Sequence, residues 1–112
     1  MTEQERMDWY AAVQARANQE GTYAVDGGMR IEELGDGWAR GALRLEPRHA
    51  NPMGIVHGGV YCTMMDQVAG TAACTGGGLC RTVNCEVRFL AAAQGDRLTS
   101  RAEAVRMGRS IA

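Results

Sequence analysis

The chain has 112 residues, with 12 basic and 13 acidic side chains and a formal net charge of −1. That length holds one domain with a modest core, so we expect a single domain over residues 1–112. Neither charge sign dominates, so nothing in the composition points to nucleic acid or an anionic membrane. No apolar run approaches the roughly 20 residues of a membrane span, and the acidic N-terminal sequence is unlike a signal peptide. We therefore predict a cytoplasmic protein with neither nucleic acid nor membrane as partner.

The cysteines contain no C-x-x-C pair, which argues against a zinc site or a redox motif. They lie at Cys62, Cys74, Cys80 and Cys85. Without a secretion signal, reduced thiols are expected rather than disulfides. A metal site built from His49, His57 and Asp66 fits no known ligand spacing, so no metal is expected.

The first elements follow from capping and periodicity. Thr2 and Glu5 have the spacing of a capping box, which predicts a helix within residues 1–20 that ends at Gly21. Its apolar residues recur at helical spacing: Met7, Tyr10, Val13 and Ala17. From Met29 the alternation predicts two strands joined by a turn over residues 34–37 and ended by Pro47.

The second half of the chain begins with a loop over residues 47–59 and a nearly all-apolar helix over 57–75. A helix that is apolar all round is typical of a buried position. Two more strands are expected, one containing residues 82–89 and one over residues 98–107. The segregation of helices and strands predicts an α+β fold, with an antiparallel sheet wrapped around the central helix.

One charged side chain stands in the apolar helix. With histidine counted as neutral, Asp66 is the only charged residue between His49 and Cys80. Burial of an unpaired carboxylate costs several kcal/mol, a large share of the ~5–15 kcal/mol that stabilises a domain. Such a residue has either hydrogen-bonding partners or a chemical role. Both alternatives stay open at this point, including a partner across a subunit interface.

The start of the same helix offers backbone donors. His57, Gly58 and Gly59 open it, and glycines let a ligand approach the unpaired N–H groups and the positive end of the helix dipole. This arrangement suits a developing oxyanion on an acyl carbonyl; the alternative is a plain loop-to-helix junction. Asn51 either donates its amide to a carbonyl or closes an Asx turn before Pro52.

The spacing of these groups bears on assembly. Asp66 follows His57 by nine residues, about 180° around a helix at roughly 100° per residue. One subunit would therefore point its amide end and its carboxylate in different directions. A site that uses both needs a second copy of the chain, so the spacing predicts a homodimer.

Residues 51–59, N-P-M-G-I-V-H-G-G, and the following Met64-Met65-Asp66 resemble the hotdog thioesterases. The pattern is similar to the phenylacetate-degradation (PaaI-like) branch, related to 4-hydroxybenzoyl-CoA thioesterases, and the likeness extends over residues 28–112. It implies a hotdog fold and hydrolysis of a medium-chain or aromatic acyl-CoA to free acid and CoA. It implies no metal and no cofactor, because CoA is part of the substrate. It also implies a homodimer or homotetramer, a dimer of dimers, with the active site at the subunit interface.

The resemblance implies a role for each matching residue. Asp66 matches the family's catalytic carboxylate, which acts as general base on water or as nucleophile. The N–H of Gly58 would polarise the thioester carbonyl with help from Asn51, and Thr82 would place water or substrate. His57 matches the motif histidine and is assigned to shaping the loop rather than to acting as base. In the family, Asp and Thr come from one subunit and Asn and Gly from the other.

Substrate contacts are expected from Gly59, Met65, Arg88, Arg106 and Arg109. For each arginine the alternative is an ordinary solvated charge.

The chain departs from the family at two places. Residues 91–93 are three alanines where relatives carry Arg-Pro, which removes one contact to the CoA phosphates, and Asn84 replaces a common acidic residue. The family pattern continues into further strands after Gly108. The resemblance therefore implies a sheet truncated at its C-terminal strands, with the gap either left open or covered by other copies.

Two other functions on this fold stay open. A non-catalytic module that binds acyl-CoA or acyl-carrier protein agrees with the altered CoA-contact positions and the missing strands. A hotdog dehydratase would pair a histidine and an acid differently, and the sequence holds no such motif.

Overall fold

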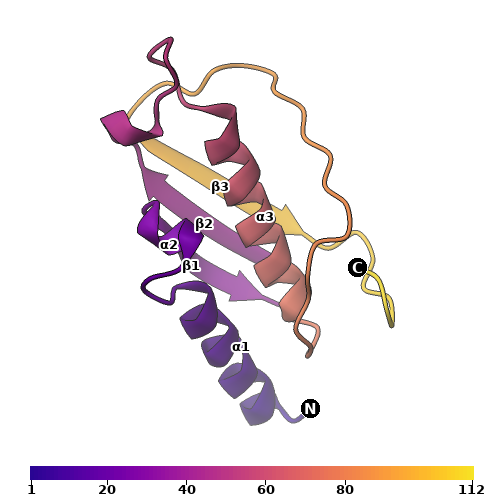
Figure 1. Cartoon of the computed structure of the whole chain (residues 1–112). Coiled ribbons are helices and arrows are strands. Elements are labelled where there is room, and N and C mark those ends of the chain that lie inside the picture. Colours follow the sequence, from indigo (N-terminus) through magenta and orange to yellow (C-terminus); the bar gives the residue numbers. More distant parts are fainter.

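A hairpin and a long helix packed across it make up most of the structure. The computed structural model describes residues 1–112. Its elements are α1 (Glu3–Ala17), α2 (Tyr23–Asp26), β1 (Met29–Gly35), β2 (Trp38–Arg44), the 3-10 turn η1 (Pro47–His49), α3 (Gly58–Cys74) and β3 (Arg97–Glu103) (Figure 1). The strands form one antiparallel sheet in the order β1-β2-β3, and α3 contacts all three. This confirms the predicted α+β class with the sheet wrapped on a central helix. No helix is long and apolar enough to cross a bilayer.

Helix α1 begins at the predicted capping box. Thr2 Oγ1 accepts from the Glu5 N–H at 3.1 Å, and Glu5 Oε1 accepts from the Thr2 N–H at 3.4 Å. The helix ends earlier than predicted, with Asn18 rather than Gly21 following its last turn. Asn18 ends it because its side chain accepts from the Ile31 N–H at 2.7 Å and donates to the Ile31 carbonyl at 2.9 Å. These two bonds tie α1 to the edge of β1.

The predicted hairpin is present and supplies the floor of the core. Strands β1 and β2 pair antiparallel, with Met29 opposite Leu43 at one end and Gly35 opposite Trp38 at the turn. Met29 and Ile31 are buried as their alternation indicated. A Cβ at Gly41 would lie 2.9 Å from Val68 Cγ2. The absence of a side chain at Gly41 is therefore what lets α3 approach β2 this closely.

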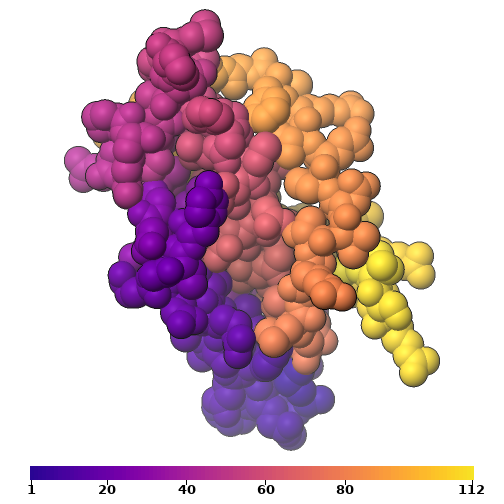
Figure 2. All heavy atoms as spheres, in the orientation of Figure 1, coloured from indigo at the N-terminus to yellow at the C-terminus, as the bar shows by residue number.

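Helix α3 is buried on one face only, so the prediction of burial all round is wrong. Met64, Val68, Thr71 and Ala72 recur every three or four residues and face the sheet. On the other side Asp66 is exposed, and Met65 is 39% exposed. Figure 2 shows this outer face of α3 between α1 and α2 on one side and the segment after residue 76 on the other. The sheet covers one side of α3, whereas Met65 and Asp66 on the opposite side stay exposed, although Thr82 contacts Asp66.

The strand predicted over residues 82–89 is also wrong. Residues 80–90 have no regular secondary structure and run beside α3 (Figure 1). A strand needs a neighbour for its backbone N–H and C=O groups, and residues 80–90 pair with none of the three strands of the sheet. Strand β3 pairs with β2 along one edge, and its other edge has no partner among residues 1–112. The strand ends at Glu103, whereas residue 107 was the predicted end.

Candidate functional site

Asp66 lies in the middle of the outer face of α3, where it meets Thr82. The Thr82 hydroxyl donates a hydrogen bond to Asp66 Oδ1, while Oδ2 has no partner within the chain. The side chain is exposed, so the prediction of a buried carboxylate is wrong for a single chain. The structure nevertheless brings together two residues, 16 positions apart, that the sequence nominated for the same site.

The start of α3 presents one unused backbone donor. His57 is the N-cap, and its Nδ1 accepts from the Gly59 N–H at 2.9 Å. Because Nδ1 is the acceptor, a neutral ring carries its proton on Nε2. The Val60 N–H donates to the His57 carbonyl at 2.9 Å, but the Gly58 N–H takes part in no hydrogen bond. The free donor at the positive end of the helix is thus the amide that the sequence nominated.

Asn51 closes the loop that leads into α3. Its Oδ1 accepts from the amides of Met53 at 2.9 Å and Ile55 at 3.3 Å, which is the Asx-turn alternative. Its own backbone N–H donates to the Ile55 carbonyl at 2.7 Å, and Ala50 and Val56 form an isolated bridge across the loop. The side-chain Nδ2 has no partner in the chain, so the turn leaves a donor available.

The two halves of the candidate site are separated along the helix axis. His57 precedes the helix, with φ −63° and ψ 137°. Because its backbone is not helical, the predicted half-turn between His57 and Asp66 does not describe how their side chains are oriented. Counted within α3, Asp66 follows Gly59 by seven residues, roughly two full turns, and both lie on the outer face. Along the helix axis, however, Asp66 lies about 12 Å from Gly58, since eight residues rise roughly 1.5 Å each. One carbonyl cannot contact both groups of one chain.

The expected substrate-contact residues lie apart from one another. Met65 is beside Asp66 on the outer face of α3. Arg88 is highly exposed and lies 3.7 Å from Glu86, a weak surface pair. Arg106 and Arg109 follow β3 in the irregular residues 104–112, are exposed and form no ion pair. A role in substrate binding stays a prediction for all of these residues and for Gly59.

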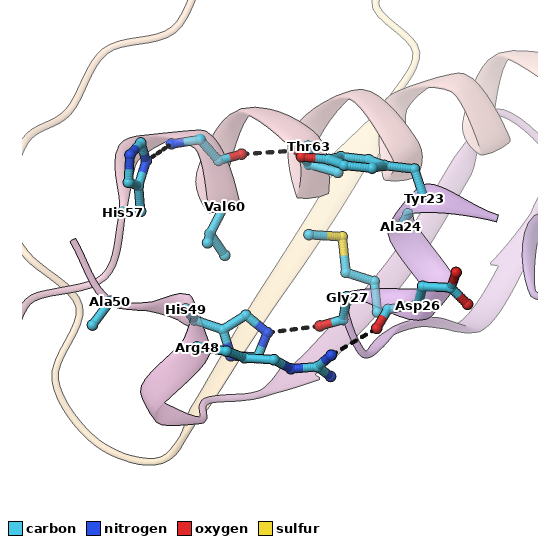
Figure 3. Close-up of a pocket in the computed structure, with 12 residues that line it drawn as sticks. Tyr23, Ala24, Asp26, Gly27, Arg48, His49, Ala50, His57, Val60 and Thr63 are labelled. Atoms are coloured by element: carbon cyan, nitrogen blue, oxygen red, sulfur yellow. Dashed lines mark hydrogen bonds between the residues drawn. The ribbon is translucent and has the colours of Figure 1, made fainter. Parts of the chain in front are cut away.

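A cavity of about 520 Å³ opens beside the start of α3, between α2, η1 and the first turns of the helix (Figure 3). Its apolar lining includes Ala24, Met29 and Val60, and Val60 points into it (Figure 3). His57 and Thr63 line the side nearest the helix start. The sequence did not indicate this cavity because α2, a helix of one turn, has no periodicity to detect.

The rim of the cavity is held by η1. His49 is buried, its Nδ1 accepts from the Glu46 N–H at 2.9 Å and its Nε2 lies 2.6 Å from the Gly27 carbonyl. Both ring nitrogens are occupied, so His49 has a structural role and is not placed to bind a ligand. Arg48 donates to the Asp26 carbonyl at 2.9 Å and ties η1 to α2 (Figure 3).

Two aromatic residues that sequence reasoning missed lie at the start of α3. Phe89 Cε1 and Cζ are each 3.5 Å from the position that a Cβ on Gly58 would occupy. The rings of Phe89 and Tyr61 meet edge to face, with centroids 5.8 Å apart and planes at 67°. The alternation over residues 82–89 predicts only a strand position for Phe89, the single phenylalanine of the chain.

The structure holds no group of His, Cys, Asp or Glu side chains placed to bind a metal ion, and the four cysteines are free thiols. Cys80 is exposed, yet its partial burial and the neighbouring Cys74 raise the pKa of its thiol. The two thiols therefore lie close together at the end of α3.

Known proteins match both the sequence and the fold. A family model described as the thioesterase superfamily matches residues 53–112. PaaI from the phenylacetic acid degradation operon of E. coli superimposes with a TM-score of 0.78 at 24% identity, over 89% of this chain and 74% of that one. A hypothetical thioesterase protein of Streptococcus pneumoniae, in a structure with coenzyme A, superimposes with a TM-score of 0.70 at 27% identity, over 76% and 69% of the two chains.

A mycobacterial protein is similar in both sequence and structure. Rv1847 of Mycobacterium tuberculosis, which is named as an esterase, is 44% identical to this chain over 46 residues. The aligned residues make up 41% of this chain and 33% of the mycobacterial protein. Its structure superimposes with a TM-score of 0.70 at 33% identity, over 75% of this chain and 71% of that one. The sequence and fold together establish that the chain belongs to the thioesterase superfamily and has its hotdog fold, as the residues around Asp66 implied.

Proposed function

We propose that the chain hydrolyses acyl-CoA thioesters to free acid and CoA, without a metal or cofactor. The observation that carries this proposal is that one helix holds both a hydrogen-bond donor and a carboxylate suited to thioester hydrolysis. Helix α3 begins with the unused Gly58 N–H and carries Asp66, oriented by Thr82, on its outer face. Membership of the thioesterase superfamily and the likeness to a streptococcal structure that contains coenzyme A support the proposal.

Each group has a chemical task in this proposal. The thioester oxygen gains negative charge as the carbonyl is attacked, and donors aimed at it lower the barrier. The Gly58 N–H and the free Asn51 Nδ2 supply those donors. Asp66 Oδ2, which has no partner, takes a proton from the attacking water or attacks the carbonyl itself. The Thr82 hydroxyl fixes the carboxylate by donating to Oδ1 and can accept a hydrogen bond from the water.

The separation of about 12 Å along α3 makes the proposed site a shared one. We propose a homodimer, alone or as half of a homotetramer, in which Asp66 and Thr82 of one copy face Gly58 and Asn51 of the other. The uncovered outer face of α3, with the exposed Met65, is the surface available for that contact. The cavity beside the helix start, with its partly apolar lining and volume of about 520 Å³, has room for a medium-chain or aromatic acyl group.

The alternative is a module that binds acyl-CoA without turning it over. One feature favours it: the segment that carries Thr82 has no strand partner. In this alternative the chain binds acyl-CoA, and Asp66 with Thr82 does not place a water for hydrolysis.

The test measures release of CoA from a panel of acyl-CoA thioesters. The released CoA is quantified by chromatography, because Cys80 and Cys85 are exposed and would react with a thiol reagent. Removal of the carboxylate by Asp66→Asn should lower kcat by about 10²–10⁴-fold, the usual size of a general-base contribution. Asp36→Asn, in the hairpin turn, is the matched control and should leave kcat unchanged. Normal turnover by Asp66→Asn would refute the mechanism, and tight binding of acyl-CoA by a wild-type chain that releases no CoA would favour the binding module.

A further inference from the structure

The phenylalanine beside Gly58 has no role in the core. Phe89 lies outside the buried cluster and is 58% exposed. Two of its ring atoms are nonetheless in van der Waals contact with the position of a Gly58 Cβ, at 3.5 Å each. The ring therefore covers one side of the first residue of α3 and leaves part of its surface open to another molecule.

Tyr61, in the first turn of α3, holds Phe89 in this place. Its ring packs edge to face against Phe89, a geometry favoured by the ring quadrupoles. Its hydroxyl accepts a hydrogen bond from the Ala93 N–H at 2.8 Å. Because residues 80–90 lack a strand partner, these contacts and the Thr82 bond to Asp66 attach the segment to the helix by side chains. The segment thus reaches both candidate halves of the site, Thr82 at Asp66 and Phe89 at Gly58.

A hydrocarbon wall at this place has a physical consequence. A hydrogen bond from an amide to a developing oxyanion is stronger where water is excluded and the local dielectric is low. The Gly58 N–H has no partner in the chain, so without a wall it would bind water on every open side. Phe89 removes water from one side and gives the acyl carbons next to the carbonyl a surface to pack against, outside the cavity that would hold the rest of the acyl group.

We propose that Phe89, positioned by Tyr61, is the residue that orients the thioester carbonyl on the Gly58 N–H. The ring contacts the acyl carbons next to the carbonyl and shields the amide from water. This inference rests on the proposed function, because it assigns Phe89 to the oxyanion half of that site. It adds a residue to which neither the sequence patterns nor the family resemblance assigned a role in the site.

The experiment uses a CoA thioether that carries a 2-oxoalkyl group, a ketone analogue that cannot be hydrolysed, labelled with ¹³C at the carbonyl. Dissociation constants, the ¹³C shift of the bound carbonyl and kcat/KM on the matching acyl-CoA are measured. Phe89→Ala should weaken analogue binding about tenfold, the scale of one aromatic contact, and should move the ¹³C resonance toward that of free analogue. Phe89→Leu, which keeps an apolar side chain, should restore part of both effects.

Leu90→Ala is the matched control, because Leu90 is the next residue and is 93% exposed. It should bind the analogue within about twofold of wild type, since exposed side chains contribute little. Tyr61→Phe keeps the ring and loses the bond to Ala93, so it should shift the resonance in the same direction as Phe89→Ala, by less.

The outcomes separate this inference from the proposed function. If wild type binds and hydrolyses acyl-CoA while Phe89→Ala behaves like Leu90→Ala in binding and in ¹³C shift, the role of Phe89 is overturned and the proposed function stands. If wild type neither binds the analogue nor releases CoA, both are overturned together.

Discussion

The position of α3 on the sheet depends on a glycine, and a substitution there should reveal it. A Cβ at Gly41 would lie 2.9 Å from Val68 Cγ2 and 3.1 Å from the Arg30 carbonyl oxygen. The first distance is shorter than carbon atoms tolerate, so Gly41→Ala forces α3 away from β2 or Val68 out of its rotamer. Overpacking of this kind costs about 1–3 kcal/mol, and we expect Gly41→Ala to lower the free energy of unfolding by about 2 kcal/mol.

A second substitution identifies the contact responsible. Val68→Ala removes Cγ2 from a side chain that is 1% exposed and alone should cost about 2 kcal/mol from the loss of two buried methyl groups. In the double variant the clash with Val68 is gone, while the close approach to the Arg30 carbonyl remains. The double variant should therefore be more stable than the sum of the single changes predicts, by about 1 kcal/mol.

Urea denaturation at one fixed protein concentration measures these differences, because self-association would add a concentration-dependent contribution. Gly70→Ala is the control: Gly70 is in the same helix, and a Cβ there meets no atom within 4 Å. It should raise stability by about 0.5–1 kcal/mol through helix propensity. Additivity of the Gly41 and Val68 changes to within about 0.5 kcal/mol would contradict the reasoning, as would an unaltered stability of Gly41→Ala.

Two further predictions concern the site and the thiols. Thr82→Val should lower kcat about tenfold or more by removing the hydroxyl that orients Asp66, and Thr82→Ser should keep most of the activity; unchanged kcat in Thr82→Val would contradict this role of the hydroxyl. Burial and the neighbouring Cys74 raise the pKa of Cys80, so less thiolate is present at pH 8 and alkylation of Cys80 should be slower than that of a thiol in an unfolded peptide. Cys74→Ser should speed the reaction, and an unchanged rate measured by mass spectrometry would contradict this cause.

The sequence predicted those parts of the fold whose signals are local. The capping box at Thr2, the alternation from Met29 and the apolar run before Cys74 each carry their own pattern, and each element formed. The strand over residues 82–89 has the same kind of alternation but failed, because a strand depends on a neighbour that its own sequence does not specify. The outer face of α3 failed as a burial prediction for a related reason: composition shows that a face is apolar, not what lies against it.

The candidate site divides in the same way. Asp66, Gly58 and Asn51 could be nominated because charge in an apolar helix, glycine at a helix start and asparagine before proline are visible in the chain. Resemblance to a family was the only ground for placing Thr82 in the same half of the site as Asp66, and their contact joins segments with no shared periodicity. Phe89 and Tyr61 could not be found, because their contact depends on the path of residues 80–93, which has no regular structure.

The most direct test of the shared site is complementation between two inactive variants. Asp66→Asn removes the carboxylate. Gly58→Pro removes the free N–H, and proline suits the first position of a helix after a residue with ψ 137°. Each variant alone should be nearly inactive in CoA release. In a two-fold symmetric dimer, mixing equal amounts after unfolding and refolding should restore about a quarter of wild-type activity, because each mixed dimer contains one intact site. A mixture no more active than the two variants measured separately would contradict a site built from Asp66 of one copy and Gly58 of the other.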